Sequence, residues 1–140
     1  MDAETGVPKL SEHGDVLEVN FGLGHGKPPT SSKVKKEYLR KIFYQLSPTE
    51  DAALGAMLVR RGPAMALQSA KFEAGEETVD EVKRVYVKSA HDLVLKPEQQ
   101  DVMIKKWPPS QVYTLATDHS PFFSAPSELF GVLIQAAASI

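Results

Sequence analysis

The strongest constraint on the fold is the alternation of strand and helix signals in the second half of the sequence. The runs 84–88 (RVYVK) and 111–117 (QVYTLAT) are rich in β-branched and aromatic residues, which predicts two strands. Between them Pro97 begins a predicted helix (PEQQDVMIKKW), and Pro126 begins another that runs to the C-terminal end. Strand, helix, strand, helix at these lengths predicts a βαβα unit with a parallel strand pair, and therefore an α/β fold class.

The first half of the sequence carries mainly helical signals. Residues 15–21 (DVLEVNF) alternate apolar and polar side chains, which predicts a short strand, and the Gly-, Pro- and Ser-rich residues 22–32 predict a loop. Apolar residues recur at helical spacing over 33–46, which predicts an amphipathic helix. The following SPTE has the pattern of a capping box, with Ser47 as the N-cap of a helix that ends near residue 60.

The remaining residues connect these elements. A looser segment is expected over 64–72 (AMALQSAKF), followed by an acidic loop over 73–78 (EAGEET). We therefore expect three parts: a tail over residues 1–14, a mainly helical segment over 15–75 and an α/β part over 76–140.

Composition excludes several classes of function. The net charge is −2 and the chain has no cysteine, so nucleic-acid binding, disulfides and a cysteine nucleophile are not expected. The four histidines show no ligand spacing, so no metal or other cofactor is expected. The most apolar run, 129–140, is too short to span a bilayer, so no membrane partner is expected either. The N-terminal MDAETG lacks the features of a secretory signal, so we expect a cytoplasmic chain, or a chloroplast one where a targeting segment precedes it.

Two polar residues follow the two predicted parallel strands. Asp92 comes after the strand 84–88, and His119 comes after the strand 111–117. Because working residues of a parallel sheet lie beyond the C-terminal ends of its strands, these two side chains are candidates for a carboxylate–imidazole pair. The carboxylate would fix the imidazole tautomer while the other ring nitrogen acts as a base. Spacing alone leaves a second interpretation open, in which Asp92 caps a turn and His119 is an ordinary loop histidine.

A base of this kind needs a nucleophile, and the sequence has no G-x-S-x-G motif, which holds the serine in α/β hydrolases. The similar run 22–26 (GLGHG) has Gly24 where the serine would stand and lies in a Pro-rich loop. The same loop is not a phosphate-binding loop, because the glycine spacing is wrong and Pro28 opposes a following helix.

The segment from Arg84 onward (RVYVKSAHDLVLKPEQQDVMIKKWPPSQVYTLATDHSPFFSAPSELFGVL) closely resembles the C-terminal end of plant methylesterases. These are esterases of the α/β-hydrolase fold, related to salicylate-binding methyl-salicylate esterases and to hydroxynitrile lyases. FGLGHGKPPTSS and KIFYQLSPTEDAALGAMLVRRGP resemble the cap region of the same family. The resemblance covers the chain from about residue 15, and its D-x-x-x-x-P-E-x-Q and D-H-S-P-F-F motifs are specific.

The resemblance implies roles for particular residues. Asp92 is similar to the acid and His119 to the base of the family's Ser-His-Asp triad. Ser120 stands where the lyase members carry a lysine, which favours an esterase over a lyase. The family hydrolyses methyl esters of small plant hormones, such as salicylate, jasmonate and indole acetate, and its cap, here expected over 33–46 and 48–60, closes over the acyl group.

The first half of the family's fold, with the oxyanion loop and the nucleophile, has no counterpart in the sequence. We therefore expect a truncated methylesterase whose own activity is absent, with an exposed sheet edge and marginal stability. The alternative is a non-catalytic interaction protein that pairs through this edge with itself, as a homo-oligomer, or with a full-length relative. A hydroxynitrile lyase relative is the third candidate.

Overall fold

The computed structural model describes residues 10–69 and 82–139. Most of the predicted tail, residues 1–9, and the predicted acidic loop 73–78 lie outside the described residues. In chain order the elements are a 3-10 turn (Leu10–His13), β1 (Leu17–Asn20), β2 (Ser31–Val34), α1 (Lys36–Tyr38), a π-helical turn (Leu39–Phe43), α2 (Thr49–Leu58), α3 (Ala64–Ser69), β3 (Val85–Ser89), α4 (Pro97–Lys106), β4 (Gln111–Leu115), α5 (Pro121–Ser124) and α6 (Pro126–Ala138).

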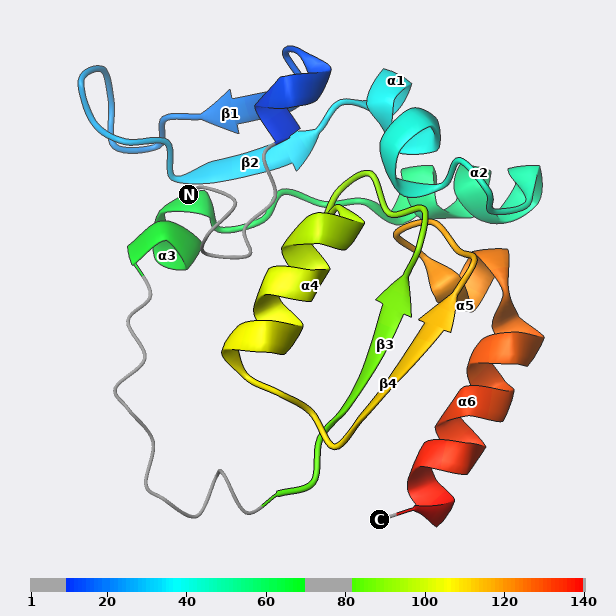
Figure 1. The fold of residues 1–140 in the computed structure, drawn as a ribbon. Coiled ribbons are helices and arrows are strands. Elements are labelled where there is room, and N and C mark those ends of the chain that lie inside the picture. Colours follow the sequence, from blue (N-terminus) through cyan, green and yellow to red (C-terminus); the bar gives the residue numbers. More distant parts are fainter. Residues whose placement is uncertain (1–9, 70–81, 140) are drawn as a thin grey trace.

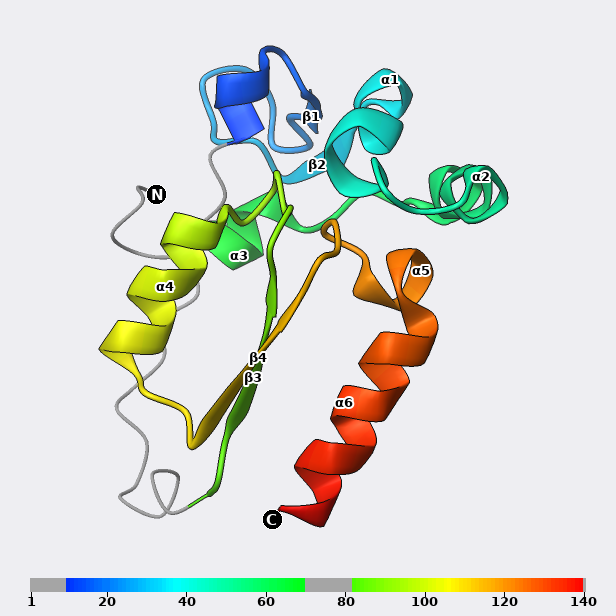
Figure 2. The ribbon, with the colours of Figure 1, turned by 45° about the vertical axis from the view of Figure 1, so that its right-hand side comes forward.

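The second half of the chain is an α/β sandwich. β3 and β4 pair in parallel, in register from Val85 opposite Gln111 to Ser89 opposite Leu115. α4 joins the two strands and lies on one face of this sheet, whereas α6 lies on the opposite face (Figures 1 and 2). The predicted parallel pair and its two helices are therefore confirmed.

α4 is tied closely to the end of β3. Its N-terminus is capped by Gln99, whose Oε1 accepts the backbone N–H of Lys96 at 3.1 Å. The buried Gln100 reaches across to Ser89, accepting its N–H at 3.0 Å and donating to its carbonyl at 2.9 Å. Gln100 also donates to the carbonyl of Leu95 at 2.8 Å. These bonds hold the chain just beyond β3, which is where the first candidate residue lies.

The structure of the first half differs from several predictions, beginning with its second strand. Residues 31–34, divided in the prediction between a loop and a helix, form β2, which pairs antiparallel with β1 from Leu17 opposite Val34 to Asn20 opposite Ser31. Helical spacing over 33–46 is therefore misleading at its start, because backbone pairing with β1 takes Val34 into a strand. The helix that remains is short: α1 has three residues and passes directly into the π-helical turn.

The π-helical turn ends the helix well before residue 46. The backbone N–H of Tyr44 bonds to the carbonyl of Leu39 at 3.2 Å, five residues back, and Tyr44 then leaves helical geometry. Arg40 stabilises the exit, because its guanidinium donates to the carbonyls of Tyr44, at 2.7 Å, and of Ser47. The amides of residues 46 and 47 are thus free to bind another part of the chain.

α2 occupies Thr49–Leu58, inside the range predicted for it, but Ser47 is not its cap. The N-cap position belongs to Pro48, and no side chain caps it. The Ser47 hydroxyl donates instead to the carboxylate of Asp118 at 2.8 Å. The capping-box interpretation is therefore wrong at Ser47, because a buried acid competes for the same hydroxyl.

Two short helices were not predicted. α3 lies in the segment expected to be loose, and α5 lies in the loop after His119. Pro121 begins α5, and the N–H groups of Phe123 and Ser124 both bond to the carbonyl of Ser120, at 2.9 and 3.0 Å. Single turns of this length give too little periodicity for sequence patterns to detect.

A small core joins the two halves of the chain. Val16, Ile42 and Val94 are buried against one another, with Tyr38 and Phe43 packed around them. By contrast, α6 leaves Phe130, Leu133 and Ile134 more than half exposed. No helix in the part of the chain that the structure describes is long and apolar enough to cross a membrane.

Candidate active site

The ends of β3 and β4 bring Asp92 and His119 together. Backbone pairing continues past both strands, because the N–H of Ala90 bonds to the carbonyl of Leu115 and that of His91 to the carbonyl of Thr117, at 2.8 and 3.0 Å. The next side chains meet there: His119 Nδ1 lies 2.9 Å from Asp92 Oδ2. The predicted hydrogen bond between the two residues is confirmed.

Asp92 also shapes the turn that follows β3. Its Oδ1 accepts the backbone N–H groups of Val94 and Leu95, at 2.7 and 2.9 Å. The residue is 5% exposed, so its carboxylate has little freedom to move. One oxygen of Asp92 thus caps a turn, as the second interpretation expected, while the other holds the imidazole, as the first interpretation requires.

His119 is oriented by two groups. Asp92 accepts the proton on Nδ1, and the Phe43 ring lies edge-on to the imidazole, with ring centroids 5.2 Å apart and planes at 85°. The side chain is 37% exposed. With the proton held on Nδ1, the lone pair is on Nε2, which is the nitrogen able to accept a proton from another molecule or group.

Asp118 and Gln45 converge on the same region, although no sequence pattern predicted a role for either. Asp118 is fully buried beside His119 and is bonded to residues 46 and 47. Gln45 Nε2 donates to the carbonyl of His91 at 2.6 Å, while its Oε1 is buried with no hydrogen-bond partner among the residues that the structure describes. Asp118 begins the D-H-S-P-F-F motif directly before His119, which was a signal for it, but no sequence pattern predicted that either side chain is buried.

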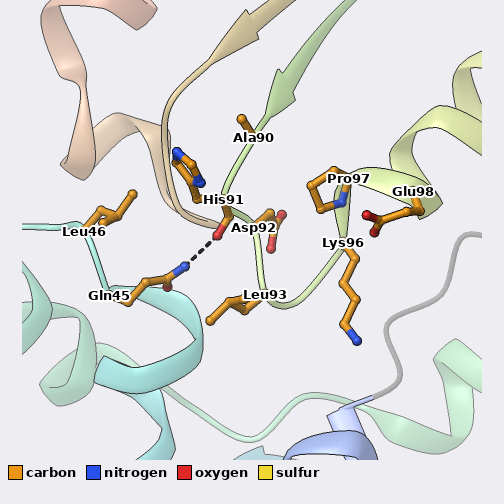
Figure 3. Close-up of a pocket in the computed structure, with 9 residues that line it drawn as sticks. All are labelled: Gln45, Leu46, Ala90, His91, Asp92, Leu93, Lys96, Pro97 and Glu98. Atoms are coloured by element: carbon orange, nitrogen blue, oxygen red, sulfur yellow. Dashed lines mark hydrogen bonds between the residues drawn. The ribbon is translucent and has the colours of Figure 1, made fainter.

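A pocket of about 480 Å³ opens beside Asp92 (Figure 3). It is lined by the side chains of the turn after β3, by the start of α4 and by Gln45 and Leu46. Gln45 and His91 lie on its wall and are joined by the hydrogen bond drawn in Figure 3. Asp92 is among the residues that line this pocket, and His119 is not.

Two tyrosines near the pair are held in the neutral form. Burial raises the pKa of Tyr44, and the negative charge of Asp118 raises it further. Burial also raises the pKa of Tyr86, with smaller contributions from Asp92 and Asp101. Within residues 10–69 and 82–139, no three His, Asp or Glu side chains gather as a metal site would need.

Known proteins resemble the chain along nearly its whole length, although no family model matches it. Methylesterase 17 of Arabidopsis thaliana is 54% identical over 142 residues, which cover 99% of this chain. The homologues of this chain are plant methylesterases. Pheophorbidase of Raphanus sativus is a second example, 42% identical over 89% of the chain.

Solved structures show the same fold. The crystal structure of the Arabidopsis methylesterase MES16 matches 91% of this chain with a TM-score of 0.85 at 38% identity. A variant of tomato methylketone synthase I complexed with beta-ketoheptanoate matches 94% with a TM-score of 0.82 at 30% identity. The fold is thus that of the α/β-hydrolase methylesterases, as the resemblance implied. The chain spans about half the length of the relatives it matches, 51% of methylesterase 17 and 54% of MES16.

Proposed function

We propose that Asp92 and His119 are the acid and base of a Ser-His-Asp triad for hydrolysis of small-molecule methyl esters. The observation that carries the proposal is the hydrogen bond of 2.9 Å between Asp92 Oδ2 and His119 Nδ1. Homology to plant methylesterases supports the reaction class. Asp92 fixes the tautomer and stabilises the imidazolium that forms during reaction.

The chemistry assigned to His119 is proton transfer in two directions. As base, Nε2 accepts the hydroxyl proton of a serine as its oxygen attacks the ester carbonyl. As acid, the imidazolium gives this proton to the methoxide as the bond between it and the carbonyl carbon breaks; methanol leaves, and the acyl group remains bonded to the serine oxygen as an acyl-enzyme. Water then attacks the acyl group by the same route, which releases the carboxylic acid. In the family this acid is a small hormone such as salicylate, jasmonate or indole acetate.

No serine of the chain lies in a sequence motif that would identify it as the nucleophile of this scheme. None of the 140 residues forms a G-x-S-x-G motif. The proposal therefore assigns acid and base to these residues, and the 140-residue chain by itself is expected to have no methylesterase activity. Residues 15–75 are assigned the role of a cap-like segment and residues 76–140 that of the catalytic α/β part.

The test compares two proteins on methyl salicylate, methyl jasmonate and methyl indole acetate. The first is the 140-residue chain, and the second is this chain fused behind the preceding part of Arabidopsis methylesterase 17. We expect turnover only from the fusion. There, His119→Ala lowers kcat/KM by about 100- to 10 000-fold, the range for a general base. His25→Ala, in the exposed loop between β1 and β2, is the matched control and keeps activity. A folded fusion that hydrolyses esters equally well with His119→Ala would refute the assignment.

A second candidate function is supported by exposed apolar surface. Among the described residues β3 and β4 pair only with each other, so each strand has an open edge. On α6, Phe130, Leu133 and Ile134 are 66%, 52% and 56% exposed. Such surface favours an interaction protein that pairs with a copy of itself or with a full-length methylesterase. Light scattering that finds a stable dimer, with no His119-dependent turnover in the fusion, would favour this candidate over the enzyme.

A further inference from the structure

Asp118 is a buried acid for which the triad chemistry has no use. It is 0% exposed and directly precedes His119. Its carboxylate accepts four hydrogen bonds. Oδ2 accepts the N–H of Leu46 at 2.9 Å, the N–H of Ser47 at 2.9 Å and the hydroxyl of Ser47 at 2.8 Å. Oδ1 accepts the N–H of Ser120 at 2.9 Å.

Only a carboxylate fits these four donors. A buried charge is costly unless hydrogen bonds replace its hydration, and here both oxygens are surrounded by N–H and O–H groups. An asparagine has one acceptor oxygen and one NH2 group. Whichever way it is turned, its NH2 group would face an N–H donor, either at Ser120 or at residues 46 and 47. The four donors therefore require the negative charge of Asp118 as well as its shape.

The bonds of Asp118 connect two segments that are 71 and 72 residues apart in the sequence. One is the exit of the π-helical turn, which Arg40 holds by its carbonyls. The other is the loop that carries His119. Tyr44 lies close enough that the charge of Asp118 contributes to its raised pKa. Asp118 is thus a direct polar link between the segment before α2 and the candidate base.

His119 lies between two anchored residues. On one side, the carbonyl of Thr117 accepts the N–H of His91 at 3.0 Å, and the Thr117 hydroxyl bonds to Ser89 at 3.1 Å. On the other side, the N–H of Ser120 is held by Asp118. Removal of the second anchor frees the loop to move, and a shift of about 1 Å is enough to break the bond from the imidazole to Asp92.

We propose that Asp118 is a positioning residue that holds His119 against Asp92 by tying its loop to residues 46 and 47. The inference rests on the proposed function only in calling His119 the base. The geometry itself can be measured without any ester. The position of His119 can therefore be tested even if the ester assay shows no turnover. In the same way, a negative result for the position of His119 does not decide the proposed function.

The test follows the proton on His119 Nδ1 by NMR in the 140-residue chain. Hydrogen-bonded to a carboxylate, this proton gives a resolved downfield signal, which His119→Ala identifies by removing it. We expect Asp118→Asn to make its exchange with solvent about tenfold faster or to abolish the signal. Asp101→Asn is the matched control, because Asp101 is exposed and bonded only to Lys88 in the described contacts. An unchanged signal in folded Asp118→Asn would overturn the proposal.

A milder variant covers the case in which Asp118→Asn does not fold. Ser47→Ala removes one of the four donors and leaves the backbone bonds in place. We expect amide exchange at Ser120 to become about fivefold faster, while the amides of Val94 and Leu95, bonded to Asp92, stay as in the parent. Ser127→Ala, on the exposed start of α6, should change neither. Equal exchange at Ser120 in Ser47→Ala and the parent would overturn the proposal.

Discussion

Asp92→Asn should reverse the tautomer of His119 while leaving the fold largely intact. The asparagine oxygen can keep the two amide bonds of the turn, to Val94 and Leu95, because those are accepted by one oxygen alone. Its NH2 group then faces His119 Nδ1 and can only donate. Nδ1 must therefore become the acceptor, and the ring proton moves to Nε2, where it blocks the nitrogen assigned to catalysis.

The contacts of Asp92 give the size of the effect on stability. Asp92→Asn exchanges a charge-assisted hydrogen bond for a neutral one, which costs about 1 kcal/mol. Asp92→Ala removes all three bonds and leaves two amides without an acceptor, at about 1–3 kcal/mol each, or about 2–6 kcal/mol together. Against a typical total of about 5–15 kcal/mol, only the alanine variant threatens the fold.

Two measurements on the 140-residue chain check this reasoning. The nitrogen chemical shifts of the neutral His119 imidazole distinguish a proton on Nδ1 from one on Nε2. Urea unfolding gives the two losses of stability. The assignment of one Asp92 oxygen to the turn and the other to His119 would be refuted by a proton that stays on Nδ1 in Asp92→Asn. An equal loss of unfolding free energy in both variants would refute it too.

Further predictions concern Gly55 and Tyr44. A Cβ at Gly55 would lie 2.8 Å from the Tyr44 ring, so Gly55→Ala should cost about 1–3 kcal/mol in urea unfolding, as overpacking does. Gly131→Ala on α6, where a Cβ meets nothing within 4 Å, should stabilise by about 0.5–1 kcal/mol; a loss of the same size at both glycines would contradict the packing argument. Burial and the charge of Asp118 raise the pKa of Tyr44 in the folded protein. The neutral phenol therefore contributes stability. This contribution is fully present below the ordinary tyrosine pKa of about 10 and is lost as the pH rises through the higher pKa of the folded state. The absorbance difference between the parent and Tyr44→Phe should show this late ionisation, and Asp118→Asn should bring it to lower pH; an unchanged titration in that variant would show that the Asp118 charge does not act on the phenol.

Local sequence patterns were sufficient for the two strands and the two longer helices of the α/β part, but not for α5. The strands at 84–88 and 111–117 are short β-branched runs, and a helix between two such strands gives a parallel pair by a general rule of topology. Placement at the strand ends then pointed to Asp92 and His119, and their hydrogen bond followed from the register.

The predictions that were wrong concern residues whose structure depends on contacts with residues far away in the sequence. Helical spacing from Val34 to Phe43 is real, but Val34 pairs with Leu17, and a strand partner outweighs helix periodicity. Serine is a residue type that often caps helices, yet the Ser47 hydroxyl donates its hydrogen bond to Asp118, 71 residues away. No window of sequence contains both members of such a pair, so local pattern reasoning cannot find them.

The π-helical turn at Leu39–Phe43 decides where this part of the chain can lose a residue. Such turns contain one residue more than an α-helix would. Deleting one residue within the turn can therefore restore ordinary α-helical winding and leave the residues beyond it in place. A deletion between Tyr44 and Ser47 has no such reserve and would carry the amides of residues 46 and 47 out of reach of Asp118. A deletion between Tyr44 and Ser47 that still folds with Ser120 protected would show that this second spacing is not fixed.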